Sequence, residues 1–218
     1  MIITIDGPAG AGKSSAAQAL ATRLGFEFLD TGAMYRSVAL AALRADIDPR
    51  DRDRLAGLLD GLRLEVQPGR VVLNGEDVSA AIRTAETTAA TGAVADSPVV
   101  RRFLAAAQRR LAAGRCIVCE GRDQGTVVFP DAGCKFFLVA DPRERARRRQ
   151  EEMNRRGEMV ELDLLLRTIE DRDRRDAGRD LAPMIPAADA VVLDSTGLSI
   201  EQVVDRMEAE VRRRLANV

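Results

Sequence analysis

Short apolar runs alternate with longer amphipathic stretches along most of this chain. Runs rich in β-branched and aromatic residues predict five buried strands, at 1–5, 26–29, 116–119, 134–140 and 190–193. Helical patterns lie between and after them, at 14–24, 33–44, 55–62, 85–95, 99–113, 142–156, 162–174 and 199–215. This alternation favours an α/β fold in which helices cover both faces of a five-stranded parallel sheet. A ligand is then expected at the carboxyl ends of the strands.

One segment has a different pattern. Residues 63–67 and 70–74 read as two strands around Pro68-Gly69, and Gly75-Glu76 is expected to begin another turn. Antiparallel strands of this kind interrupt the β/α alternation. We therefore expect one unit over 1–218, with a core of 1–60 and 84–218 and an inserted subdomain at about 61–83.

Composition places the chain among soluble globular proteins. It has 218 residues, 46% hydrophobic and 31% charged, with a net charge of −1. No long-range field would attract nucleic acid or an anionic membrane. No apolar run is long enough for a membrane span, and Asp6 interrupts the only apolar N-terminal run. We expect a cytoplasmic protein without a membrane or nucleic-acid partner.

Histidine and cysteine usage restricts the chemistry. Histidine is absent, which excludes Ser-His and Cys-His nucleophile pairs and histidine-ligated metals. Cys116 and Cys119 match C-x-x-C, but on a strand residues three apart face opposite sides. With Cys134, they are expected to be buried, reduced thiols.

The first predicted strand runs into a complete phosphate-binding sequence. Residues 7–14 match G-x-x-x-x-G-K-[ST] between a strand and a helix, the context that distinguishes a P-loop from an accidental glycine turn. Lys13 is one of only two lysines among 33 basic residues. A compact ammonium fits beneath a phosphate chain and a planar guanidinium does not. The predicted ATP-binding residues are Gly7, Pro8, Ala9, Gly10, Ala11, Gly12, Lys13, Ser14 and Ser15.

Several P-loop classes can be set aside. A regulatory GTPase needs an N-K-x-D motif, and the sequence has none. Asp194-Ser-Thr-Gly197 matches D-x-x-G, but it follows the last strand and reads as a turn. A large ATPase does not fit this length. A small-molecule kinase does, with Lys13 on the β and γ phosphates and Ser14 on Mg²⁺.

Two charged segments complete the candidate chemistry. Glu120 ends a predicted strand, where a carboxylate holds Mg²⁺ directly or through water. Arg122 offers a fork for a phosphate, and Asp123 an acceptor for an exocyclic amine. Residues 172–180 alternate arginine and aspartate. Salt-bridged loops and solvated helix faces have similar patterns, so each segment alone leaves both interpretations open.

Four strings together resemble the bacterial cytidylate kinases, a family of P-loop nucleoside monophosphate kinases. They lie at 30–36, 120–131, 172–179 and 186–196, so the resemblance covers nearly the whole chain. It implies an adenylate-kinase-like fold, with 61–83 as an NMP-binding insertion and about 154–162 as a short lid. It also implies transfer of the γ-phosphoryl of ATP, as Mg-ATP, to CMP or dCMP.

The resemblance further implies a role for individual residues. Arg36, Arg122 and Arg179 would bind the CMP phosphate, and Asp176 the ribose hydroxyls. Thr31, Arg101 and Asp123 would contact the cytosine. Arg148 or Arg149 would approach the ATP phosphates, and Ser14 and Glu120 would hold the metal. The implied catalytic residues are Lys13, Arg122, Arg148 and Arg179. The chain departs from the family at three positions, with Thr31 for serine, Glu120 for aspartate and Gly92 for a cytosine-contacting serine.

Other functions remain open at this point. Another small P-loop kinase could act on UMP, shikimate or dephospho-CoA. A nucleic-acid-binding protein could use the arginine runs 147–149 and 212–214, although few aromatic residues are present for stacking. A kinase-like fold without activity could serve as an interaction module. We expect a monomer whose partners are ATP and CMP or dCMP.

Overall fold

The computed structural model describes residues 1–67, 69–155 and 157–216 of the chain. Within these residues it divides into two compact units, Met1–Phe28 with Gly114–Val218 (unit 1) and Leu29–Ala113 (unit 2). None of the described helices has the length and apolarity that a membrane span requires.

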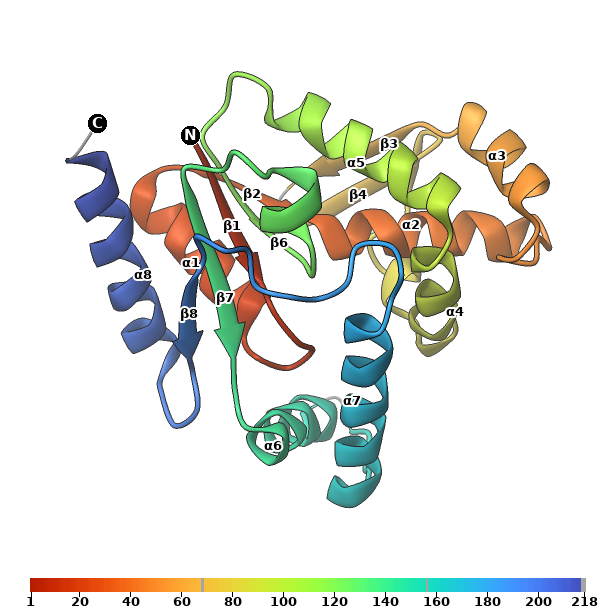
Figure 1. The fold of residues 1–218 in the computed structure, drawn as a ribbon. Coiled ribbons are helices and arrows are strands. Elements are labelled where there is room, and N and C mark those ends of the chain that lie inside the picture. Colours follow the sequence, from red (N-terminus) through yellow and green to blue (C-terminus); the bar gives the residue numbers. More distant parts are fainter. Residues whose placement is uncertain (68, 156, 217–218) are drawn as a thin grey trace. The chain divides into compact units, whose positions relative to one another are not determined.

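The main sheet confirms the predicted parallel fold. Its strands are β1 (Ile2–Asp6), β2 (Glu27–Asp30), β6 (Ile117–Glu120), β7 (Cys134–Val139) and β8 (Val191–Asp194), in the order β2-β6-β1-β7-β8. β1 pairs in parallel with β6 and β7, and β7 with β8 (Figure 1). The order reverses at β1, so loops at its carboxyl end stand where such sheets bind ligands.

The core of unit 1 lies between the sheet and two helices. α1 (Lys13–Leu24) and α8 (Ile200–Leu215) pack against each other, and Figure 1 shows them beside the strands. Ile3, Phe136 and Leu138 from the sheet meet Leu20 and Met207 from the helices. Two further helices, α6 (Pro142–Asn154) and α7 (Leu162–Ala177), pack on one another. The sequence predicted all four, although α7 continues three residues beyond Arg174.

Unit 2 combines helices with a small sheet. Its helices are α2 (Thr31–Arg44), α3 (Arg52–Asp60), α4 (Ala85–Ala95), α5 (Pro98–Ala112) and the short turn η1 (Ala81–Arg83). β3 (Leu64–Gln67), β4 (Arg70–Leu73) and β5 (Glu76–Asp77) form an antiparallel sheet in the segment where we expected one. Of the turn between β3 and β4, Pro68 lies outside the described residues.

Several predicted boundaries were wrong. α2 begins at Thr31, where a turn was expected, because the Asp30 side chain accepts from the Ala33 amide at 2.7 Å and caps the helix. In the same way Asp51 caps α3, which begins at Arg52. Glu76 lies in β5 and not in a turn. Cys116 precedes β6 and is exposed, so only Cys119 and Cys134 are the buried free thiols expected.

Candidate active site

The P-loop follows β1 and leads into α1. Gly7 has φ 137°, and a Cβ there would lie 2.0 Å from the carbonyl oxygen of Leu138, so only glycine fits. Gly12 is left-handed and gives α1 an N-terminus without a side-chain cap. The first amides of the helix are therefore available to an anion at the positive end of the helix dipole.

Lys13 is buried inside this loop. Its side chain is 5% exposed, and its Nζ donates to the carbonyl oxygen of Pro8 at 2.7 Å. Burial first, and then the nearby charge of Arg122, lowers the pKa of Lys13 to about 7, although Glu120 and Asp6 act in the opposite direction. An anion bound beside this ammonium would favour its charged form.

Ser14 and Glu120 bring two oxygen ligands together. Ser14 Oγ donates to Glu120 Oε1 at 3.0 Å, joining the start of α1 to the end of β6. Glu120 is only 8% exposed. A hydroxyl and a carboxylate at this spacing are the hard oxygen donors that Mg²⁺ prefers when phosphates complete its coordination.

Three arginines gather around one carboxylate beyond β6. Asp176, in α7, is 3% exposed. It accepts from Arg122 Nε at 3.0 Å and pairs with an Arg179 Nη at 2.8 Å, while Arg172 Nε lies 3.9 Å away. We call these four residues the arginine cluster. The structure thus brings together three residues that the sequence selected and adds Arg172, to which we had assigned no role.

Arg148 lies beside the P-loop, where its guanidinium would be 3.8 Å from a Cβ at Gly12. Its Nε donates to Glu144 at 3.0 Å, and its two Nη atoms donate to the Oγ and carbonyl oxygen of Ser195, at 3.2 and 2.7 Å. Ser195 Oγ also donates to the carbonyl oxygen of Ala11 at 3.1 Å. Arg148 therefore supports the P-loop from outside through Ser195. Its predicted contact with ATP phosphates stays a prediction.

Arg145 is a site residue that sequence reasoning missed. Its side chain donates to the carbonyl oxygens of Ala9 in the P-loop and Ala140 after β7, each at 3.0 Å, and pairs with Asp173 of α7 at 2.6 Å. A buried guanidinium fork thereby links the P-loop to the helix of the arginine cluster. Within a run of similar arginines, only its burial identifies it, and burial is not visible in the sequence.

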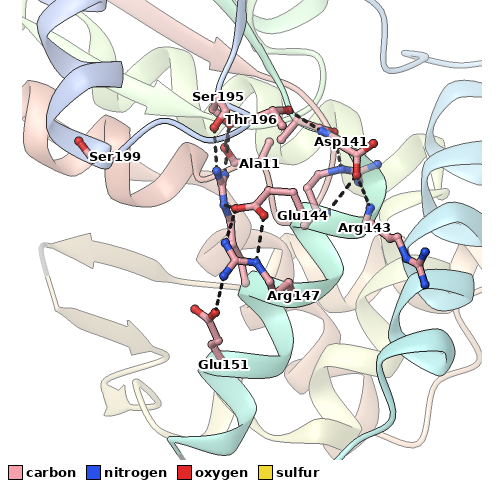
Figure 2. Close-up of polar contacts among 12 residues, drawn as sticks. Ala11, Asp141, Arg143, Glu144, Arg147, Glu151, Ser195, Thr196 and Ser199 are labelled. Carbon is pink, nitrogen blue, oxygen red and sulfur yellow. Dashed lines mark hydrogen bonds and ion pairs between the residues drawn. The ribbon is translucent and has the colours of Figure 1, made fainter.

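The arginines of the runs 147–149 and 212–214 form ion pairs within their own helices. Arg149 pairs with Glu152 at 2.8 Å, and Figure 2 shows Arg147 between Glu144 and Glu151. On α8, Arg212 pairs with Glu208, and Arg213 and Arg214 with Glu210. Each arginine of the two runs thus has a glutamate of its own helix as an ionic partner, unlike the cations of a basic surface for nucleic acid.

Unit 2 carries three other predicted residues. Thr31 is 2% exposed at the start of α2, and Arg36 one turn later pairs with Asp30 at 3.3 Å. Arg101, in α5, donates to the carbonyl oxygen of Ala95 at 3.0 Å and lies 5.9 Å from the centre of the Tyr35 ring. Within this unit the two arginines are thus held by neighbouring groups.

Comparisons with known proteins identify the family of this chain. A sequence profile of the family described as cytidylate kinase matches residues 3–213. A cytidylate kinase of Geobacter sulfurreducens is 50% identical, over 98% of this chain and 94% of that protein. A bifunctional pantoate ligase/cytidylate kinase of Prochlorococcus marinus is 47% identical over 94% of this chain and 43% of its own length.

Solved structures show the same fold at lower identity. A gluconokinase of Sinorhizobium meliloti superposes with a TM-score of 0.51 at 20% identity, covering 99% of this chain and 93% of that one. A shikimate kinase of Bacteroides thetaiotaomicron gives 0.51 at 14% identity, covering 97% and 98%. At such identities the likeness concerns the fold alone.

Proposed function

Because the chain belongs to the cytidylate kinase family, we propose that it transfers the γ-phosphoryl of ATP to CMP or dCMP, forming ADP and CDP or dCDP. The observation that carries the proposal is the nearness of two cations in unit 1, where the charge of Arg122 is close enough to lower the pKa of the buried Lys13. A lysine in a P-loop matches a donor triphosphate, and an arginine fork matches a second phosphate.

The chemical step needs no general base from the protein. A phosphate oxygen of the acceptor, already ionised near neutral pH, attacks the γ-phosphorus of ATP. The bond from that phosphorus to the β–γ bridging oxygen breaks, and ADP leaves with the bonding electron pair. The absence of histidine is compatible with this route.

Catalysis then depends on alignment and neutralisation of charge. The P-loop amides and Lys13 hold the donor phosphates, and Arg122 and Arg179 hold the acceptor phosphate once it replaces Asp176 as their partner. Ser14 and Glu120 would hold Mg²⁺, which neutralises charge on the β and γ phosphates when bound. Asp176 would then be free to bind the ribose hydroxyls.

The family resemblance assigns the base of the acceptor to Thr31, Arg101 and Asp123, and its phosphate also to Arg36. The insertion at 61–83 and the lid at 154–162, in which Arg156 lies outside the described residues, would exclude water and so suppress hydrolysis of ATP. UMP remains the alternative nucleotide acceptor, since Gly92 replaces a serine that contacts cytosine in the family.

One assay tests the proposed function. ADP release from ATP and magnesium is measured with CMP, dCMP, UMP, AMP and shikimate as acceptors, each over a range of concentrations. We expect the highest kcat/KM for CMP or dCMP. A higher value for UMP, AMP or shikimate, or no turnover with any nucleotide, would contradict the assignment.

A further inference from the structure

A buried carboxylate at the end of β1 holds the loop that follows β6. Asp6 is 4% exposed. Its Oδ1 accepts from the Gln124 amide at 2.8 Å and its Oδ2 from the Gly125 amide at 2.7 Å, bonds that join residues 118 and 119 positions apart. A carboxylate that accepts two backbone amides forms charge-assisted bonds, which are stronger than those between neutral groups.

The segment held by Asp6 is a π-helical turn, Gln124–Val128. Its amides at Val127 and Val128 donate to the carbonyl oxygen of Asp123, at 2.9 and 3.2 Å. Such turns are rare and occur often at functional sites. This one begins directly after Arg122 and Asp123, so its position determines where their backbone lies.

A second attachment lies on the other side of Arg122. The Gly121 amide donates to the carbonyl oxygen of Ile5 at 3.0 Å. The segment is also tightly packed, because a Cβ at Gly121 would lie 2.6 Å from Gln124 Cγ, and a Cβ at Gly125 would lie 2.9 Å from Thr4 Oγ1. β1 therefore fixes the loop at both ends, through a backbone carbonyl before Arg122 and through Asp6 after Asp123.

We propose that Asp6 is a positioning residue for the acceptor nucleotide, which holds Arg122 and Asp123 in place by anchoring the π turn behind them. The residue after Asp6 is Gly7, the first of the P-loop. Asp6 thus connects β1, which leads into the P-loop, to the loop whose Arg122 and Asp123 would bind the acceptor nucleotide. The proposal rests on the proposed function, in which Arg122 and Asp123 bind the acceptor.

The test compares the effect of a substitution at Asp6 on KM for the acceptor, CMP, with its effect on KM for the donor, ATP. In Asp6→Asn the side chain keeps its size, but one amide of the turn now faces an NH₂ group and loses its acceptor. We expect KM for CMP to rise about ten-fold, as for loss of a hydrogen bond to a charged group. KM for ATP should change by less than about two-fold, because the P-loop keeps its own contacts.

Thr4→Val is the matched control. Thr4 is buried in the same strand next to Gly125, and its Oγ1 has no hydrogen-bond partner among the described residues. Its KM values for both substrates should match those of the wild type. Equal rises in both KM values for Asp6→Asn, or no rise for CMP, would overturn the proposal.

Further measurements distinguish a failure of the proposed function from a failure of the role proposed for Asp6. If the wild type does not phosphorylate CMP, the proposed function fails, and the same comparison with the acceptor it does use still tests Asp6. Amide hydrogen exchange at Gln124 and Gly125 should accelerate in Asp6→Asn, and unchanged exchange would contradict the anchoring. If Asp6→Asn does not fold, Asp6→Ser, with one hydroxyl acceptor, is expected to show the same split in KM.

Discussion

The only two lysines of the chain are both buried, and their surroundings differ. Lys135, in β7, is 6% exposed, pairs with Asp189 at 2.9 Å and donates to the carbonyl oxygen of Pro130. Lys13 is 5% exposed, and its bond goes to the neutral carbonyl oxygen of Pro8. Burial lowers the pKa of Lys13 to about 7 despite the carboxylates nearby. The ammonium of Lys135 thus has a carboxylate partner, whereas that of Lys13 donates to a carbonyl in the loop where we propose that phosphates bind.

The ion pairing of the arginine cluster is intermediate between that of Lys135 and that of Lys13. Its three guanidinium groups all lie near the same carboxylate, Asp176. A phosphate entering the cluster can replace Asp176 without leaving any arginine unpaired. Under the proposed function, the donor phosphates would bind beside Lys13, which donates to a neutral carbonyl, whereas the acceptor phosphate would replace Asp176 as the partner of the arginines.

Replacing each lysine by methionine tests whether the two lysines have different roles, and Lys13→Met is expected to have the largest effect. Lys13→Met should lower kcat by about 10²–10³-fold, the loss typical of removing one group that stabilises transition-state charge. Its stability should equal or exceed that of the wild type, because a poorly compensated buried charge is removed. Steady-state ADP release and urea unfolding measure the two effects.

Lys135→Met is the matched control, with the opposite pattern. It should retain kcat within about two-fold and lose about 1–2 kcal/mol of unfolding free energy, because the half-exposed Asp189 and the Pro130 carbonyl lose their partner. A Lys135→Met enzyme as inactive as Lys13→Met would remove the distinction between a structural and a functional lysine.

Asp6 is a buried carboxyl group near Lys13, and its titration predicts that the stability of the protein depends on pH. Burial, partly offset by the amides of Gln124 and Gly125, raises the pKa of Asp6 from 3.8 to about 6. The folded state therefore binds a proton at Asp6 between these values, and the contribution of Asp6 to stability is lost as the pH rises through 6. Asp6→Asn does not titrate.

The difference in unfolding free energy between wild type and Asp6→Asn should accordingly shift by about 2 kcal/mol in favour of the wild type as the pH falls from 7 to 4.5. Urea unfolding of both proteins over this range measures it. A difference independent of pH would show that Asp6 titrates in the folded protein as it does in the unfolded chain.

A smaller effect is expected at the arginines to which we assign the acceptor phosphate. Arg179→Lys keeps the charge next to Asp176 but loses the planar fork, so KM for CMP should rise about ten-fold while KM for ATP stays nearly constant. Arg147→Lys, on the glutamate-paired face of α6, is the control and should leave both constants unchanged. A rise in KM for ATP alone would place Arg179 on the donor side.

Local signals in the sequence were enough for much of the fold and for the position of the P-loop between β1 and α1. The P-loop is defined by residues next to one another, and the local helical pattern at 199–215 is observed as α8, with Ser199 as its cap. The β3–β4 hairpin likewise follows from alternation around a turn. In each case the interacting groups lie within a few residues, so pattern and structure coincide.

The features that were missed depend on distant contacts. The π turn has no periodicity of its own and is held by Asp6, 118 residues before Gln124. Arg145 resembles its neighbours in the sequence and differs only by its bonds to Ala9 and Asp173. The early start of α2 was a local error, since Asp30 could have been recognised as a cap.

The central claim, that Lys13 is kept for the phosphates of a nucleotide, can be tested directly because the chain has only two lysines. Labelling with [ε-¹³C]lysine gives two side-chain signals, and Lys13→Met assigns them. In the free protein we predict that Lys13 titrates with a pKa near 7, and that saturating ADP raises this pKa by more than about one unit. A Lys13 signal whose titration is the same with and without ADP would contradict the account.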